Sequence, residues 1–211
     1  MKQVWNIILG FTVTETGTVA GVTNDTTASK TVTVTVEDNG DGTLTATADS
    51  TDDEPLTFTN TYKAGSVTAS FPVKKVLEVP EGLTAGDITG KFTFTLTGSA
   101  GAPMPATTSC TNPDANGGSM TFGPITFTAP GAYTYTVTET GTVAGVTNDA
   151  QAAKTVTVTV VDNGDGTLTA TADAEKLIFT KAYNVGETSL SIPVEKTLYV
   201  PEGLTTCDIT G

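Results

Sequence analysis

The sequence predicts an all-β protein made of immunoglobulin-like two-sheet β-sandwich repeats in tandem. One observation behind this is the alternation of β-branched or aromatic residues with polar ones along many short segments, which is the period of half-buried strands. Glycine, proline and short polar runs separate these segments, and no helical pattern lies between them. A long internal repeat completes the argument: residues 11–49 return at 135–173 with 34 of 39 positions identical, and 71–90 return at 192–211 with 14 of 20 identical.

The repeat sets the expected domain organisation. Its period of about 120 residues is that of a whole domain rather than of a solenoid coil. We expect residues 1–63 to be the C-terminal part of one domain, 66–184 a complete domain, and 188–211 the start of a further one. Truncation of a longer surface protein at both ends is the favoured explanation. Strand exchange is the alternative, although residues 188–211 of one chain and 1–63 of another together lack a counterpart of 91–126.

The first strands flank a distinctive turn. In 30–37 the valines face one way and the threonines the other, and 43–48 alternates in the same manner. Between them, the run Asp-Asn-Gly-Asp-Gly at 38–42, repeated at 162–166, predicts a tight hairpin because Gly, Asn and Asp tolerate positive φ. The run is similar in composition to a calcium loop. Gly40 and Gly42, however, stand where an EF-hand needs oxygen ligands, so we expect a plain turn and no metal.

In the complete domain, strands are expected over 71–79, 92–97, 120–127 and 132–138. The longest loop is expected at 102–119. Trp5 falls in one alternating row with Ile7, Leu9 and Phe11, so we expect it in the core.

Composition excludes several functions. The formal net charge is −13, and the chain has neither arginine nor histidine, so a basic nucleic-acid patch is excluded. There is no Ser/His/Asp set, no Cys/His pair and no phosphate-binding glycine loop, so we expect no enzyme and no cofactor.

No apolar segment is long enough to span a membrane. Cys110 and Cys207 fall at non-equivalent repeat positions and establish no disulfide framework. An acidic, threonine-rich chain of this kind indicates a soluble extracellular protein.

Three polar residue types interrupt the apolar rows. Lys75 lies in the row of Phe71, Val73, Leu77 and Val79, and Glu139 ends the row of Tyr133, Tyr135 and Val137. Asn60 lies between Phe58 and Tyr62, and the other copies place Lys196 and Glu15 on the corresponding faces.

Two interpretations compete for these residues. A lysine and a glutamate on core faces are costly if charged and unpaired, so they could form a buried ion pair, or the lysine could extend to solvent at a sheet end. The alternative is a self-formed Lys–Asn amide. Burial would lower the pKa of the lysine and make its neutral amine a nucleophile, while a buried glutamate passes a proton and ammonia leaves.

A family resemblance bears on this choice. The ordered segments are VKKVL at 73–77, FTFTL at 92–96, YTYTVTE at 133–139 and VVDNGDGTLT at 160–169, followed by a terminal FTNTY such as 58–62. Together they resemble the Gram-positive pilin isopeptide-linkage domain of streptococcal major pilins and of repeats in cell-wall-anchored adhesins. The resemblance covers essentially the whole chain.

The resemblance implies a role for each polar residue. Lys75 and Lys196 correspond to isopeptide donors, Glu15 and Glu139 to assisting acids, and Asn60 to an acceptor. The complete domain departs from this pattern, because Lys181 occupies its acceptor position and cannot accept. Asn184 is three residues further and is expected to face the other way. We therefore expect a Lys75–Glu139–Lys181 cluster without an isopeptide bond in that domain.

These features favour a structural module in the stalk of a bacterial surface adhesin or pilus-like protein. Its expected partners are adjacent repeats of the same protein, and the resemblance implies a cell-wall-anchored location. The alternative is a ligand-binding adhesin domain that recognises a host protein or glycan, with the loop at 102–119 as the candidate binding site.

Overall fold

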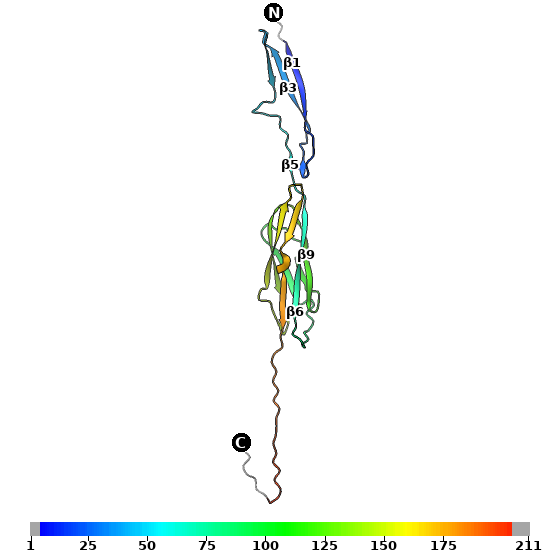
Figure 1. Cartoon of the computed structure of the whole chain (residues 1–211), viewed down its shortest axis with the longest axis vertical. Coiled ribbons are helices and arrows are strands. Elements are labelled where there is room, and N and C mark those ends of the chain that lie inside the picture. The colour runs from blue at the N-terminus through cyan, green and yellow to red at the C-terminus, as the bar shows by residue number, and fades with distance from the viewer. Residues whose placement is uncertain (1–4, 204–211) are drawn as a thin grey trace.

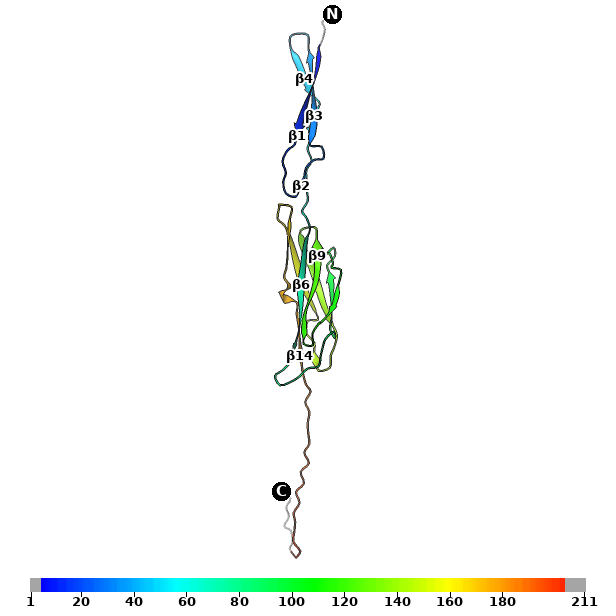
Figure 2. The same ribbon diagram turned by 90° about the vertical axis from the view of Figure 1, so that its right-hand side faces the viewer.

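The computed structural model describes residues 5–203, and the regular secondary structure in this range is almost entirely β-strand (Figure 1). Two bodies follow each other along one long axis, and an extended tail continues from the second (Figures 1 and 2). The prediction of an all-β sandwich protein is confirmed. The single helical turn in the described range is the 3-10 segment η1 (Ala174–Lys176). Within this range no helix has the length and apolar character needed to cross a membrane.

The first body is a single sheet, here called the N-terminal sheet. Its order is β1 (Asn6–Thr14), β3 (Ser29–Asp38), β4 (Leu44–Ala48), and all pairs are antiparallel. At its lower end, β2 (Val22–Thr23) pairs with β5 (Thr61–Tyr62). The turn at 38–42 joins β3 to β4, with Gly40 and Gly42 at φ values of 74° and 91°, as the Asn/Asp/Gly composition predicts.

The second body, residues 67–183, is a two-sheet sandwich, here called the central sandwich. One sheet has the order β13 (Leu168–Ala172), β12 (Ala153–Asp162), β10 (Gly131–Thr140), β7 (Thr93–Gly98), β8 (Ser109–Thr111). The other has the order β11 (Val146–Thr147), β14 (Ile178–Tyr183), β6 (Val67–Glu78), β9 (Gly117–Phe127). All neighbours are antiparallel except β14 and β6, the last and first strands, which run parallel.

Alternation along the strands builds the core of this sandwich. On β6, every second residue from Phe71 to Leu77 is buried and its neighbours face outward. Aromatic rings from both sheets meet between the layers: Phe94 and Phe179 pack edge to face with their centroids 5.3 Å apart. This packing of two apolar sheet faces is the main source of stability of the sandwich.

The expectation that Trp5 is a core residue is wrong. Its side chain is 64 % exposed, and Ile7, Leu9 and Phe11 of the same row are also exposed. The alternation itself is present in β1, but among residues 5–203 no second sheet packs on this face. An alternating strand buries its apolar row only where another layer covers it.

The expected loop at 102–119 is also different, because it contains β8 and the first residues of β9. Asn112 fixes it: its Oδ1 accepts from the Phe92 N–H at 3.0 Å, and its Nδ2 donates to the Ile88 carbonyl at 2.8 Å. Asn112 is fully buried, so these bonds replace its contacts with water. Cys110 in β8 is free, and burial raises the pKa of its thiol. Cys207 lies outside the described residues.

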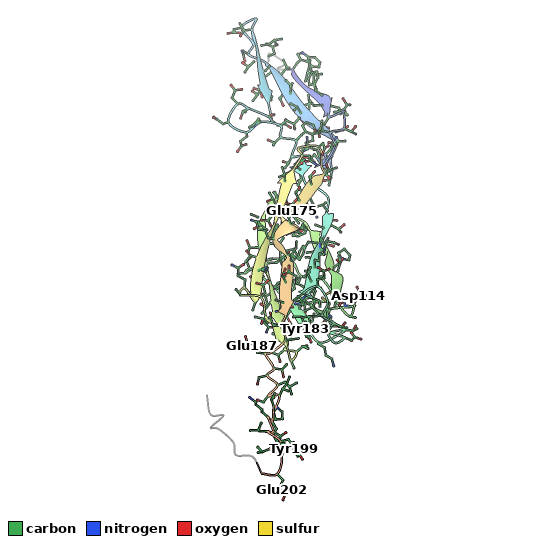
Figure 3. All side chains as sticks on the ribbon, turned by 60° about the horizontal axis from the view of Figure 1, so that its bottom comes forward. Asp114, Glu175, Tyr183, Glu187, Tyr199 and Glu202 are labelled. Atoms are coloured by element: carbon green, nitrogen blue, oxygen red, sulfur yellow. The ribbon has the colours of Figure 1, made fainter. Side chains whose placement is uncertain are left out.

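Beyond Tyr183 the described chain continues to 203 without a helix or strand. Figure 3 shows Tyr183 at the lower end of the sandwich and Tyr199 far along the tail. Apolar side chains of this tail are open to solvent, with Val194 88 % exposed.

Candidate functional site

The candidate site begins with a lysine inside the central sandwich. Lys75 lies on β6 between the buried residues Val73 and Leu77, and only 1 % of it is exposed. β6 is an inner strand, flanked by β14 on one side and β9 on the other. The alternation of this strand therefore directs Lys75 between the two sheets, where a charge needs a partner.

That partner comes from the opposite sheet. Glu139, near the end of β10, is 5 % exposed, and its Oε1 lies 2.8 Å from Lys75 Nζ. Its Oε2 lies 2.5 Å from Nζ of Lys181, which is 3 % exposed. The parallel register of β14 on β6 places Phe179 beside Lys75 and Lys181 beside Leu77, so both lysines reach one carboxylate. Glu139 thus ties the first and last strands of one sheet to a strand of the other.

An aromatic ring completes the cluster. Phe92 is fully buried, and its ring centroid lies 4.3 Å from Lys75 Nζ and 5.2 Å from Lys181 Nζ. The negative face of the ring attracts both ammonium groups and partly compensates the excess positive charge of two lysines on one glutamate. The sequence pattern did not assign this role to Phe92.

Burial sets the protonation of the central lysine. Desolvation lowers the pKa of Lys75 from 10.5 to about 8, and the hydrogen bond and charge of Glu139 only partly oppose this. A pKa in this range makes a neutral, nucleophilic amine accessible near neutral pH. In the described part of the chain no side-chain amide pairs with it, however, because Lys181 occupies the neighbouring position on β14. Asn184 is exposed, and its Nδ2 donates to Thr147 Oγ1 at 2.9 Å.

The N-terminal sheet carries a related arrangement that has an amide. Asn60 Nδ2 donates to Glu15 Oε1 at 2.6 Å, and Asn60 Oδ1 accepts from the Asp25 backbone N–H at 2.9 Å. Both ends of the side-chain amide are therefore held, and the N–H polarises its carbonyl toward attack. Glu15 Oε2 is buried and has no hydrogen-bond partner among the described residues. We refer to Glu15, Asn60 and Asp25 as the amide half-site.

The sequence analysis did not single out Asp25, yet this residue positions the segment that carries the acceptor Asn60. Its Oδ2 accepts from the Thr59 N–H at 2.9 Å and from Lys30 Nζ at 2.7 Å. The hydrogen bond from Lys30 and those from the Thr59 and Thr27 backbones hold the pKa of Asp25 well below its usual range. The repetition of this acid and lysine as Asp149 and Lys154, a pair 3.1 Å apart, was the signal that could have revealed it.

The structure does not bring the last predicted residue, Lys196, to any of these groups. Lys196 is exposed. The tail that contains it extends from the end of the central sandwich that lies away from the N-terminal sheet (Figure 1). Among the described residues, no group of three or more acidic, histidine or cysteine side chains is close enough to hold a metal ion.

Comparison with known families identifies the family to which this chain belongs. The family model described as the Spy0128-like isopeptide containing domain, FctA, matches residues 9–63 and 71–184. The chain belongs to this family. The Spy0128-like domains are isopeptide domains of Gram-positive pilins, so this chain is a structural module of an extracellular surface protein. The matched ranges contain the Lys75–Glu139–Lys181 cluster and the amide half-site. A search of curated proteins finds no match.

Proposed function

We propose that this chain is a force-bearing stalk segment of a cell-wall-anchored adhesin or pilus-like protein. Membership of the Spy0128-like family supports the structural role. The observation that carries the mechanical part is the parallel pairing of β6 with β14, the strands through which the chain enters and leaves the central sandwich. In this proposal the domain boundaries are 1–63, 66–184 and 188–211.

Pulling on the two ends loads this pair in shear. The chain enters β6 at Val67, leaves β14 at Tyr183, and the strands overlap from Lys74 to Glu78. Several ladder hydrogen bonds must then break together rather than one after another. The Lys75–Glu139–Lys181 cluster adds a second connection, because it joins both loaded strands to β10 of the opposite sheet.

In the central sandwich this connection is noncovalent. An isopeptide bond requires an amide or acid carbonyl that the lysine amine can attack, and Lys181 offers none. Two ammonium groups on one carboxylate, over the face of Phe92, form a charged tie in place of a covalent one.

The amide half-site is, in this proposal, the reactive one. Its acceptor Asn60 is held between Glu15 and the Asp25 N–H, and the unpartnered Glu15 Oε2 is where an incoming lysine amine would bind. Lys196 is the donor that this chain carries for such a site, because the sequence around it repeats that of Lys75.

Peptide mapping by mass spectrometry tests the assignment in the central sandwich. After unfolding and digestion, we expect the peptide with Lys75 and the peptide with Lys181 to be recovered separately, each at its sequence mass. A cross-linked pair that is lighter by one ammonia and disappears in Lys75→Met would refute the noncovalent assignment. Lys176→Met, at an exposed lysine of η1, is the matched control.

A further inference from the structure

The N-terminal sheet and the central sandwich meet at a hairpin. This hairpin, residues 162–166, joins β12 to β13 and lies against the lower end of the first body (Figure 1). Tyr62 Oη donates to Asp162 Oδ1 at 2.6 Å and accepts from the Gly166 N–H at 3.2 Å. The Gly65 N–H donates to the Gly166 carbonyl at 2.8 Å. We call residues 162–166 the docking hairpin, and its contact with the preceding residues of the chain the joint.

Backbones touch directly in this joint. A Cβ on Gly21 would lie 2.5 Å from Gly166 Cα, and a Cβ on Gly166 would lie 2.6 Å from Gly21 Cα. Both residues also have positive φ, 76° and 83°. Only glycine satisfies both conditions, so the docking hairpin fits a surface that has a glycine at this point.

The hairpin at 38–42 has the same sequence and shows the docking hairpin without a joint. A Cβ on its last residue, Gly42, would meet nothing within 4 Å. In both hairpins the first aspartate accepts from the N–H of the glycine two residues further, at 2.8 Å and 2.9 Å. In both, the asparagine side chain donates to two threonine hydroxyls. The docking hairpin is therefore preorganised, so docking costs little conformational entropy.

The glycine that receives the hairpin is preformed in the same sense. The repeat of Gly21 is Gly145, which is covered by Tyr183 and Asn184 instead of a hairpin. It has nearly the same φ, 74° against 76°. The Gly21 carbonyl accepts from the Lys63 N–H at 2.8 Å, and the Gly145 carbonyl accepts from the Asn184 N–H at 2.7 Å. The left-handed backbone at Gly21 is thus set by its own turn and exists before the hairpin docks.

The linker between the two bodies is fixed on both sides. Residues 63–66 have the composition Lys-Ala-Gly-Ser, which is typical of a flexible linker. In the structure, however, the Lys63 N–H donates into the first body and the Gly65 N–H donates to the docking hairpin. Ala64, between them, packs against the core of the central sandwich. A linker held in this way leaves little freedom for the bodies to rotate.

A joint with so few bonds is sufficient because its two sides are tethered. A short linker keeps tethered partners at an effective concentration of about millimolar, so even a weak contact stays closed. One of the bonds is also strong, because its acceptor is charged. The hydrogen bonds from Tyr62 and from the Gly164 N–H lower the pKa of Asp162, which is therefore a carboxylate at neutral pH.

We propose that the docking hairpin recognises the preceding repeat and fixes its orientation, so that the two consecutive bodies form one stiff unit. The partner that it fits is a domain of the same chain that presents a left-handed glycine and a tyrosine hydroxyl, here Gly21 and Tyr62. The Asp-Asn-Gly-Asp-Gly run at 162–166 thus has a role in recognition between neighbouring domains. This inference goes beyond the proposed force-bearing function and does not depend on the chemistry of any lysine.

A matched pair of variants tests the proposal in the full chain. Gly166→Ala and Gly42→Ala place the same methyl group at the same position of two identical hairpins, and φ is positive at both. Only the methyl group at 166 collides with Gly21. We expect hydrogen exchange of the Gly65 N–H, measured by NMR, to become at least about tenfold faster in Gly166→Ala and to stay unchanged in Gly42→Ala. An equal effect of the two substitutions would overturn the proposal.

The orientation of the two bodies has a direct measurement. Residual dipolar couplings of the unmodified chain should fit one common alignment tensor for the N-terminal sheet and the central sandwich. In Gly166→Ala, the two bodies should need separate tensors. Separate tensors in the unmodified chain would mean that the bodies reorient independently, and this would overturn the stiff unit.

The tyrosine hydroxyl has its own test, which strains no turn. Tyr62→Phe keeps the ring and loses the bond to Asp162, so exchange of the Gly65 N–H should become about tenfold faster, the effect of losing one hydrogen bond to a charged group. Tyr199→Phe, at an exposed tail tyrosine, is the matched control. Equal exchange in both variants would overturn the role assigned to the hydroxyl. None of these substitutions alters the Lys75–Glu139–Lys181 cluster, so failure of the joint and failure of the proposed function are distinguishable.

Discussion

Replacing Lys181 by asparagine should convert the central sandwich into a covalently closed domain. Asparagine stands at the corresponding position of the N-terminal sheet, where Asn60 Nδ2 reaches the glutamate oxygen at 2.6 Å. In Lys181→Asn the new amide should therefore lie between Glu139 and Lys75. In the unmodified chain, a pKa of about 8 leaves roughly a quarter of the Lys75 amines neutral at pH 7.5, against about one in a thousand at the ordinary value of 10.5. Burial, the largest cause of this lowered pKa, is retained in Lys181→Asn, although the smaller effect of the Lys181 charge is lost.

The expected consequence can be estimated from the positions of the linked residues. A bond between residues 75 and 181 closes a loop of about 100 residues, which stabilises the folded state by about 4–5 kcal/mol through the entropy of the unfolded chain. For a domain of this size the melting temperature should rise by roughly 10–20 °C. Calorimetry measures this shift, and the intact mass of the unfolded protein should fall by one ammonia.

Two controls make the outcome decisive. Lys75→Met/Lys181→Asn removes the nucleophile and should retain its full mass. Glu139→Gln/Lys181→Asn removes the proton carrier and should form the bond much more slowly. A folded Lys181→Asn protein that keeps its ammonia after days at pH 8 would refute the argument that the identity of residue 181 alone prevents the bond.

Three further predictions concern the Lys75–Glu139–Lys181 cluster and the contact between the N-terminal sheet and the central sandwich. Glu139→Gln leaves two buried lysines without a counter-charge and should destabilise the central sandwich by about 3–5 kcal/mol in chemical denaturation, whereas a cost below about 1 kcal/mol would contradict the burial of the pair. Stability should also rise between pH 8 and 10, because the unfolded chain still binds a proton at Lys75 that the folded chain has released. The gain is about 2–3 kcal/mol relative to Lys75→Met, measured by denaturation across that range, and parallel pH profiles would count against the lowered pKa. Finally, Gly21→Ala should loosen the contact between the N-terminal sheet and the central sandwich without unfolding the sandwich, because a Cβ on Gly21 would collide with Gly166. Small-angle scattering would detect this as a broader distribution of the maximum length of the molecule. An unchanged distribution would contradict the close contact of Gly21 with Gly166.

The sequence was sufficient for much of the central sandwich. Period-2 alternation is a local property of a strand, so the row through Phe71, Val73 and Leu77 predicts that Lys75 points inward without knowledge of the opposite sheet. The same reasoning applied to Trp5 gave the wrong environment, because burial also requires a second layer over the strand, and a local pattern does not say whether one is present.

Other features depend on tertiary structure that no local pattern encodes. Phe92 precedes β7 in an irregular segment, and its place over both lysines follows from how that segment returns across the sandwich. The contact between Gly21 and Gly166 is made by backbone atoms, so it produces no hydrophobic or charge pattern. Its only trace in the sequence is the recurrence of glycine, and recurrence alone does not say which glycines meet.

Because β6 and β14 pair directly, the central sandwich can carry tension even where the chain between these two strands is cut. Tension passes directly from the entering strand to the leaving strand, and the strands from β7 to β13 are bypassed. A proteolytic nick in an exposed turn such as 128–130, between β9 and β10, would cut the polypeptide yet leave both ends of the sandwich connected through the ladder and the buried charges. A module built in this way can lose the continuity of its backbone at one surface turn without being severed.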